Sequence, residues 1–167
     1  MSSTEESSLE ERNKTLIRSF IEEIFNQHNL SSMEKYFGRD SVEGSPRAGK
    51  GGEGFKQFLT DFFEAFPDMH TTIEHIIAEN NLVVVFLNGS GTHKGGFRGV
   101  QSTNNKVNIR SADLYRIENE IITGHWDVVD QLNLLKQTGA LLSEDVNKEF
   151  KDAKVVWIHD YKESGVS

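Results

Sequence analysis

Residues 121–130 combine apolar, aromatic and ionisable side chains in one short stretch. Their sequence is Ile121-Ile122-Thr123-Gly124-His125-Trp126-Asp127-Val128-Val129-Asp130. Its β-branched and aromatic residues predict a strand. Because a strand points alternate side chains to opposite faces, His125 and Asp127 share one face. Burying either group costs free energy unless the group is paired or hydrogen-bonded. Two interpretations follow: a His–Asp hydrogen bond that only fastens the strand, or an acid–base pair at the bottom of a pocket.

Composition excludes several classes of protein. The chain has 167 residues and a formal net charge of −8, which fits one acidic domain and argues against nucleic-acid or anionic membrane partners. It has no cysteine, so disulfides, zinc-thiolate sites and thiol nucleophiles are excluded. No apolar run reaches transmembrane length, and no signal-peptide pattern opens the chain, so we expect a cytoplasmic protein.

Helical periodicity dominates the N-terminal part of the chain. Apolar residues recur at three- and four-residue steps between Leu16 and Phe25, which predicts one apolar helix face. A short second helix carries Tyr36. A third helix has a row of phenylalanines that includes Phe58 and Phe62 and ends before Pro67. Such a row is typical of a core, and it also suits the wall of an apolar pocket.

The period then changes to that of strands. We predict strands over 69–78, 82–93, 106–117 and 121–129, a loop or short strand over 40–48, and a short last helix over 131–137. Helices followed by an antiparallel meander indicate an α+β fold with helices on one face of a curved sheet. We expect a loose N-terminal arm over 1–12, one domain over 13–140, and an appendage over 141–167 that holds a helix and a strand.

The second face of the predicted sheet is also apolar. Strand alternation places Ala112, Leu114, Trp126 and Val128 opposite His125 and Asp127. An apolar second face needs a cover. The sequence therefore predicts a homodimer that forms through the sheet face.

Several motifs, in this order, resemble the SnoaL-like polyketide cyclase (ester cyclase) family. They are Phe20-Ile21-Glu22-Glu23-Ile24-Phe25-Asn26-Gln27, Gly54-Phe55, Ala65-Phe66-Pro67-Asp68-Met69-His70, Gly91-Thr92-His93-Lys94-Gly95, Asp113-Leu114-Tyr115-Arg116-Ile117 and His125-Trp126-Asp127-Val128-Val129-Asp130. The resemblance implies the cone-shaped half-barrel of the nuclear transport factor 2-like fold, in which a curved antiparallel sheet carries the N-terminal helices on its concave face.

The resemblance also implies cofactor-free chemistry on a small apolar organic ligand inside the cone. The position that matches the general acid and base of the characterised cyclases is Asp127, with His125 beside it. Ser111 matches a polar neighbour on the adjacent strand, and His93 matches a histidine of the glycine-rich strand end. Gly44 stands where the family often has a histidine, so we expect one pocket side chain to be missing.

The predicted reaction is an intramolecular aldol closure of a polyketide-like ketoester, with Asp127 and His125 as catalytic residues, because desolvation makes a carboxylate a better base. The predicted substrate-binding residues are Ser111, Asp113, His93, Phe58, Phe62 and Tyr36. No metal or other cofactor is expected: His70 and His75 lie five apart on a strand and face opposite ways.

Other functions remain open on the same fold. A non-catalytic module that binds a small molecule or dimerises is one alternative, because one fold hosts many functions. An isomerase or dehydratase that uses the same pocket is another. A buried, proton-holding Asp127 would favour an enzyme, and a solvated one would favour a binder.

Overall fold

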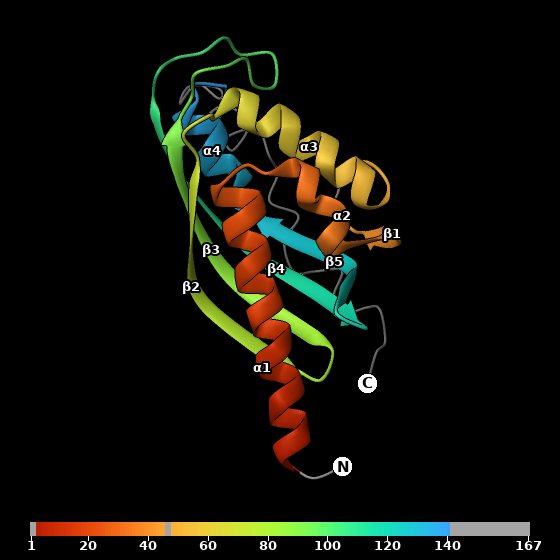
Figure 1. Cartoon of the computed structure of the whole chain (residues 1–167). Coiled ribbons are helices and arrows are strands. Elements are labelled where there is room, and N and C mark those ends of the chain that lie inside the picture. The colour runs from red at the N-terminus through yellow and green to blue at the C-terminus, as the bar shows by residue number, and fades with distance from the viewer. Residues whose placement is uncertain (1–2, 46–47, 141–167) are drawn as a thin grey trace, which may run out of the picture.

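The computed structural model of the protein describes residues 3–45 and 48–140, with side chains from residue 9 onward. Within these residues a five-stranded sheet has the strand order β1-β5-β4-β3-β2. Helices lie along one face of this curved sheet (Figure 1). The predicted α+β cone is therefore confirmed, and the predicted appendage lies outside the described residues.

Four of the strands form the predicted antiparallel meander. They are β2 (His70–Glu79), β3 (Leu82–Thr92), β4 (Lys106–Glu118) and β5 (Ile121–Val129). The fifth strand, β1 (Phe37–Glu43), runs parallel to β5 at the edge of the sheet. The sheet is consequently mixed rather than purely antiparallel, and β1 begins earlier than the loop or short strand predicted over 40–48.

The third helix ends before Pro67 as predicted, whereas the first helix begins earlier than predicted. The helices are α1 (Ser3–Phe20), which continues as a π-helical turn (Ile21–Asn26), a 3₁₀ turn (Leu30–Ser32), α2 (Met33–Tyr36), α3 (Gly51–Ala65) and α4 (Gln131–Gln137). Helix α1 extends into the segment predicted as a loose arm. The side chain of Asp130 accepts a hydrogen bond from the backbone N–H of Asn133 at 3.1 Å and so caps α4.

The hydrophobic core lies between the helices and the concave face of the sheet. Helix α1 buries Ile17 and Phe20, and α3 buries Phe55, Leu59 and Phe63 at helical spacing. The inward-facing residues of β3 and β4 close the core from the other side, and they include Val83, Val85, Leu87, Tyr115 and Ile117. No helix in the described part of the chain is long and apolar enough to span a membrane.

Candidate active site

A cavity of ≈ 90 Å³ opens between α3, α4 and the concave face of the sheet. Its walls are mostly aromatic and aliphatic, which is typical of small-molecule sites. The lining residues are Phe25, Phe55, Phe58, Leu59, Phe62, Met69, Thr71, Leu87, Gly89, Phe97, Arg98, Ile109, Ser111, Asp113, Asp127, Val129, Gln131 and Leu134.

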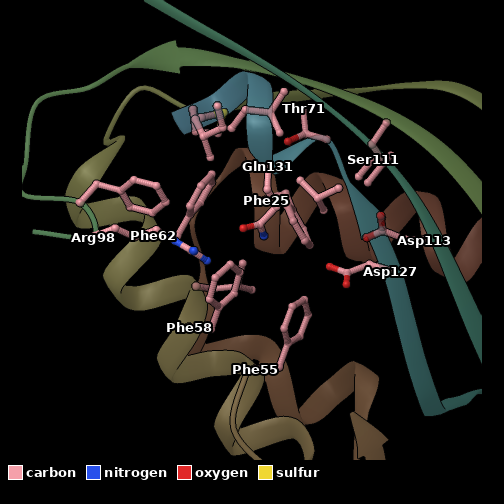
Figure 2. A pocket seen from close by; sticks show the side chains of 18 residues that line it. Phe25, Phe55, Phe58, Phe62, Thr71, Arg98, Ser111, Asp113, Asp127 and Gln131 are labelled. Atoms are coloured by element: carbon pink, nitrogen blue, oxygen red, sulfur yellow. The ribbon is translucent and has the colours of Figure 1, made fainter. Parts of the chain in front are cut away.

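Two carboxylates stand together on the floor of this cavity. Asp113 of β4 and Asp127 of β5 are directly opposed partners in the antiparallel ladder. Such partners point to the same face of a sheet. Figure 2 shows both carboxylates on one side of the cavity and Phe55, Phe58 and Phe62 across from them.

His125 lies behind these carboxylates, and its side chain is 0% exposed. Its Nδ1 is 2.9 Å from Oε2 of Glu43, and its Nε2 is 3.3 Å from Oδ2 of Asp113. Both ring nitrogens therefore face carboxylate oxygens. A neutral imidazole has one donor and one acceptor nitrogen, whereas an imidazolium has two donors, so this geometry fits the charged form.

Electrostatics favour the same protonation state. Burial acts to lower the pKa of His125, but its hydrogen bonds to Asp113 and Glu43, together with their negative charges, outweigh burial and raise the pKa to about 9. His125 is therefore an imidazolium at neutral pH. It offsets part of the negative charge that Glu43, Asp113 and Asp127 would bring to this site.

Aromatic rings fix the plane of the imidazolium. The ring of Tyr115 stacks on His125 with centroids 4.8 Å apart, and the ring of Phe55 lies 4.7 Å away. Such contacts are favourable for a cation. The Tyr115 hydroxyl donates to Oδ2 of Asp113 at 3.3 Å. Burial, followed by the charge of Asp113, raises the pKa of Tyr115 well above its usual value, which keeps this hydroxyl a donor.

Strand β1 supplies Glu43, which sequence reasoning did not single out. Glu43 pairs in register with His125 across the parallel β1–β5 ladder. Its side chain is 0% exposed, and Oε1 also accepts the backbone N–H of Ser45 at 2.7 Å. The signal that would have revealed Glu43 is the pairing of β1 with β5, and this pairing joins segments far apart in the sequence.

Gly44 follows Glu43 along the chain. Its position shows that the expectation of a missing pocket side chain was wrong. A Cβ added to Gly44 would lie 2.0 Å from Cδ1 of Trp126. Trp126 alternates with His125 and Asp127 along β5 and so belongs to the outer face. A histidine at position 44 would meet Trp126 rather than enter the cavity, and its Cβ would force the indole to move.

The structure brings together most of the predicted site residues. Ser111, Asp113, Asp127, Phe58 and Phe62 all line the cavity, and His125 supports it from behind. Their roles in catalysis and in substrate binding stay predictions.

Two of the predicted substrate-binding residues lie outside the lining of this cavity. Tyr36 is not among the described residues that line the cavity, and its hydroxyl donates to Oε2 of Glu23 at 2.6 Å. His93 is also absent from that lining. It is buried against Phe66 and Phe97, with its Nδ1 3.0 Å from Oγ1 of Thr103.

The mouth of the cavity adds residues that sequence reasoning missed. Arg98 comes from a tight turn closed by hydrogen bonds between Phe97 and Val100, and it holds a φ of 50°. Gln131 comes from the first turn of α4. Figure 2 shows both side chains reaching over the space between the helices and the sheet. No motif marks these positions, since their placement depends on how a loop and α4 fold over the sheet.

Asp113, His125 and Asp127 are the described residues with the spacing to hold a metal ion. Each offers one ligand atom, and these atoms lie within 4.8 Å of one another. Coordination through Nε2 would require His125 to give up the proton that it donates to Asp113. The contacts of both ring nitrogens with carboxylate oxygens fit a protonated ring instead.

The fold is an α+β half-open cone. It encloses a cavity that has a polar floor and an aromatic wall. A sequence model of the SnoaL-like polyketide cyclases matches residues 15–138. The chain belongs to the SnoaL-like polyketide cyclase family. Among curated proteins, none matches the chain.

Solved structures have the same architecture. AclR from Streptomyces galilaeus is 26% identical, with a TM-score of 0.73 over 80% of this chain and 99% of that protein. IdmH from Streptomyces antibioticus is also 26% identical, with a TM-score of 0.68 over 76% of this chain and 98% of that protein. A SnoaL-like polyketide cyclase from Agrobacterium tumefaciens is 16% identical, with a TM-score of 0.63 over 75% of this chain and 96% of that protein, and it supports the fold alone.

Proposed function

We propose that the protein catalyses the intramolecular aldol closure of a small polyketide-like ketoester, with Asp127 as general acid and base. The observation that supports this most is the pair of carboxylates on the floor of an otherwise apolar cavity. A carboxylate shielded from water by aromatic walls is a stronger base than one in solution. Membership of a cyclase family agrees with this chemistry.

In the proposed reaction Asp127 removes a proton from a carbon next to a carbonyl group. The resulting enolate carbon attacks a second carbonyl carbon of the same molecule and forms the ring-closing carbon–carbon bond. The electron pair of that second carbonyl moves to its oxygen, which takes the proton back from Asp127. All atoms and electrons are retained, so the product is an isomer of the substrate.

Other groups at the site would stabilise the charge that develops. The Ser111 hydroxyl lines the cavity on the same face of β4 as Asp113 and can donate to the enolate oxygen. The His125 imidazolium lies behind the two carboxylates and offsets part of their charge. His125 thus acts by orienting and by electrostatics, while Asp127 moves the proton.

Proton removal can be tested before the natural substrate is known. Purified protein is incubated in D₂O with ethyl levulinate, a small ketoester, and deuterium entry at the carbons beside the ketone is followed by NMR. We expect exchange above the buffer rate, and a loss of about 10²-fold or more in Asp127→Asn, since general base catalysis contributes that much.

Asp40→Asn is the matched control, because Asp40 is an exposed aspartate on β1. We expect it to exchange deuterium at the wild-type rate. Equal exchange in wild type and Asp127→Asn would contradict the proposed role of Asp127. No exchange above buffer in the wild type would favour the non-catalytic ligand-binding function.

We also propose that two copies pair through the outer face of the sheet. Two cross-strand rows cover this face: Ile77, Val84, Leu114 and Trp126 in one, and His75, Phe86, Ala112 and Val128 in the other. Val128 is 77% exposed, and Ile77 is 60% exposed. An apolar patch of this kind marks an interaction surface, and the same patch on a second copy is chemically complementary to it.

The oligomeric state tests this pairing. Analytical ultracentrifugation at micromolar concentration is expected to show a dimer for the wild type and a monomer for Val128→Glu. Leu132→Glu is the matched control, because Leu132 is an exposed leucine on α4 outside this face. A monomeric wild type, or a Val128→Glu variant that stays dimeric, would reject the pairing.

A further inference from the structure

The two carboxylate oxygens of Asp113 lie in different surroundings. Oδ2 accepts hydrogen bonds from Nε2 of His125 and from the hydroxyl of Tyr115, both at 3.3 Å. Oδ1 is buried, and no described residue donates a hydrogen bond to it. Asp113 is 4% exposed and lines the cavity. One oxygen is therefore held by the protein, and the other is left to whatever enters.

A buried acceptor without a partner costs free energy, and a donor that reaches it recovers that cost. Nε2 of His125 and the hydroxyl of Tyr115 are both directed at Oδ2 of Asp113. Rotating the carboxylate to satisfy Oδ1 would break the contact of Oδ2 with His125 or Tyr115. Among the described residues, Oδ1 is consequently a buried acceptor without a donor, held in place by the contacts of Oδ2.

We propose that Asp113 determines specificity by accepting a hydrogen bond from a hydroxyl group of the ligand, and that Glu43 and His125 are the positioning residues that hold it for this purpose. The inference rests on the proposed function, which it deepens by naming the ligand as a hydroxyl-bearing ketoester. A ketone oxygen cannot donate a hydrogen bond. The hydroxyl is therefore a group separate from the carbonyls that react.

Glu43 supports this arrangement because its carboxylate, together with that of Asp113, favours the ring of His125 with both nitrogens protonated. The charged and titratable groups that face His125 are Glu43 from β1, Asp113 and Tyr115 from β4, and Asp127 from β5, while α3 contributes the ring of Phe55. Without the charge of Glu43, a neutral His125 that kept its Nδ1 proton would turn a lone pair towards Oδ2 of Asp113. That repulsion would release the carboxylate from its position.

A pair of small aromatic ligands tests the hydroxyl preference directly. p-Cresol and toluene differ by one hydroxyl group, and both suit a cavity walled by Phe55, Phe58 and Phe62. Dissociation constants are measured by NMR titration of the full chain at pH 7. We expect p-cresol to bind at least tenfold more tightly than toluene. Saturating p-cresol, but not toluene, should shift the carboxyl ¹³C signal of Asp113 in the wild-type protein.

Variants then assign the preference to its residues. Asp113→Asn is expected to lose the preference for p-cresol, while Asp127→Asn keeps it. Glu43→Gln is expected to reduce the preference and also to lower the pKa of His125, read from the ¹⁵N shifts of its ring, which a purely structural role would not change. Asp40→Asn, an exposed acid on the same strand as Glu43, should change neither quantity.

Three results would overturn the inference. One is equal binding of the two ligands by the wild type with no shift at Asp113. Another is a preference that disappears in Asp127→Asn and persists in Asp113→Asn, because the acceptor would then be Asp127. The third is an unchanged His125 pKa in Glu43→Gln. None of these measurements requires turnover, so a failure of the proposed ring closure would be seen separately, as absent deuterium exchange.

Discussion

The floor and the mouth of the cavity are built in opposite ways. On the floor, Asp113 is held by His125 and Glu43, which lie behind it on the neighbouring strands β5 and β1, through ladder pairing, hydrogen bonds and ring stacking. At the mouth, Arg98 is exposed on a turn, and its guanidinium contacts the ring of Phe97 at 5.6 Å. The sheet therefore fixes the polar floor, while a loop supplies Arg98 to the cavity lining.

A substitution that removes the cation behind the floor of the cavity should have the largest effect on stability. In His125→Gln the carboxylates of Glu43 and Asp113 lose the buried cation between them. Removing one partner from a buried ionic group costs about 3–5 kcal/mol, and we expect a loss of that size in urea denaturation. His70→Gln replaces an exposed histidine and should change stability by no more than ~0.5 kcal/mol. Similar losses in both variants would contradict a charged floor.

The same cation should make stability depend on pH. The folded-state pKa of His125, about 9, lies above its ordinary value of 6.5. Its contribution is therefore complete below pH 6.5 and is lost as the pH rises through 9. The shift corresponds to about 3 kcal/mol, which we expect as the fall in unfolding free energy between about pH 6 and pH 9.5.

His125→Gln is also the reference for this pH dependence, because it lacks the titrating ring. Its unfolding free energy should lose most of the wild-type slope over the same pH window. A wild-type stability that is flat between these pH values, or that rises with pH, would show that His125 is not held as a cation.

Changes at the mouth should have the smallest effect on the fold. Arg98→Gln removes an exposed charge, so we expect stability within ~0.5 kcal/mol of wild type. Its effect should appear in ligand affinity instead, since Arg98 lines the cavity. Lys94→Gln alters an exposed cation of the same loop outside the lining residues and serves as the control. A large loss of stability in Arg98→Gln would mean that the turn helps to hold the floor.

Local sequence signals predicted most of the fold. The alternation of β5 placed His125 and Asp127 on one face, and in the structure their polar atoms lie in one cluster with that of Asp113. The phenylalanines of α3 were predicted as core or pocket wall, and they serve as both. These predictions succeeded because strand and helix periodicity depend on near neighbours in the chain.

Features that depend on distant contacts escaped sequence reasoning. Strand β1 has two buried residues at its inner positions, Phe37 and Ser41, and no strict alternation, so its pairing with β5 left no clear pattern. Glu43 was missed for that reason. The direction of Gly44 followed from the same pairing. Tyr36 was predicted to bind substrate, but it lies outside the cavity lining, and its hydroxyl donates a hydrogen bond to Glu23.

The protonation state of His125 decides whether a buried cation lies at the floor of the cavity. The ¹⁵N shifts of its two ring nitrogens are followed by NMR between pH 5 and pH 10 in the wild-type protein. We expect both nitrogens to carry protons at pH 7 and the ring to titrate with a pKa of about 9. A neutral ring at pH 7, with a pKa at or below 6.5, would contradict the account of a buried cation that organises the floor of the cavity.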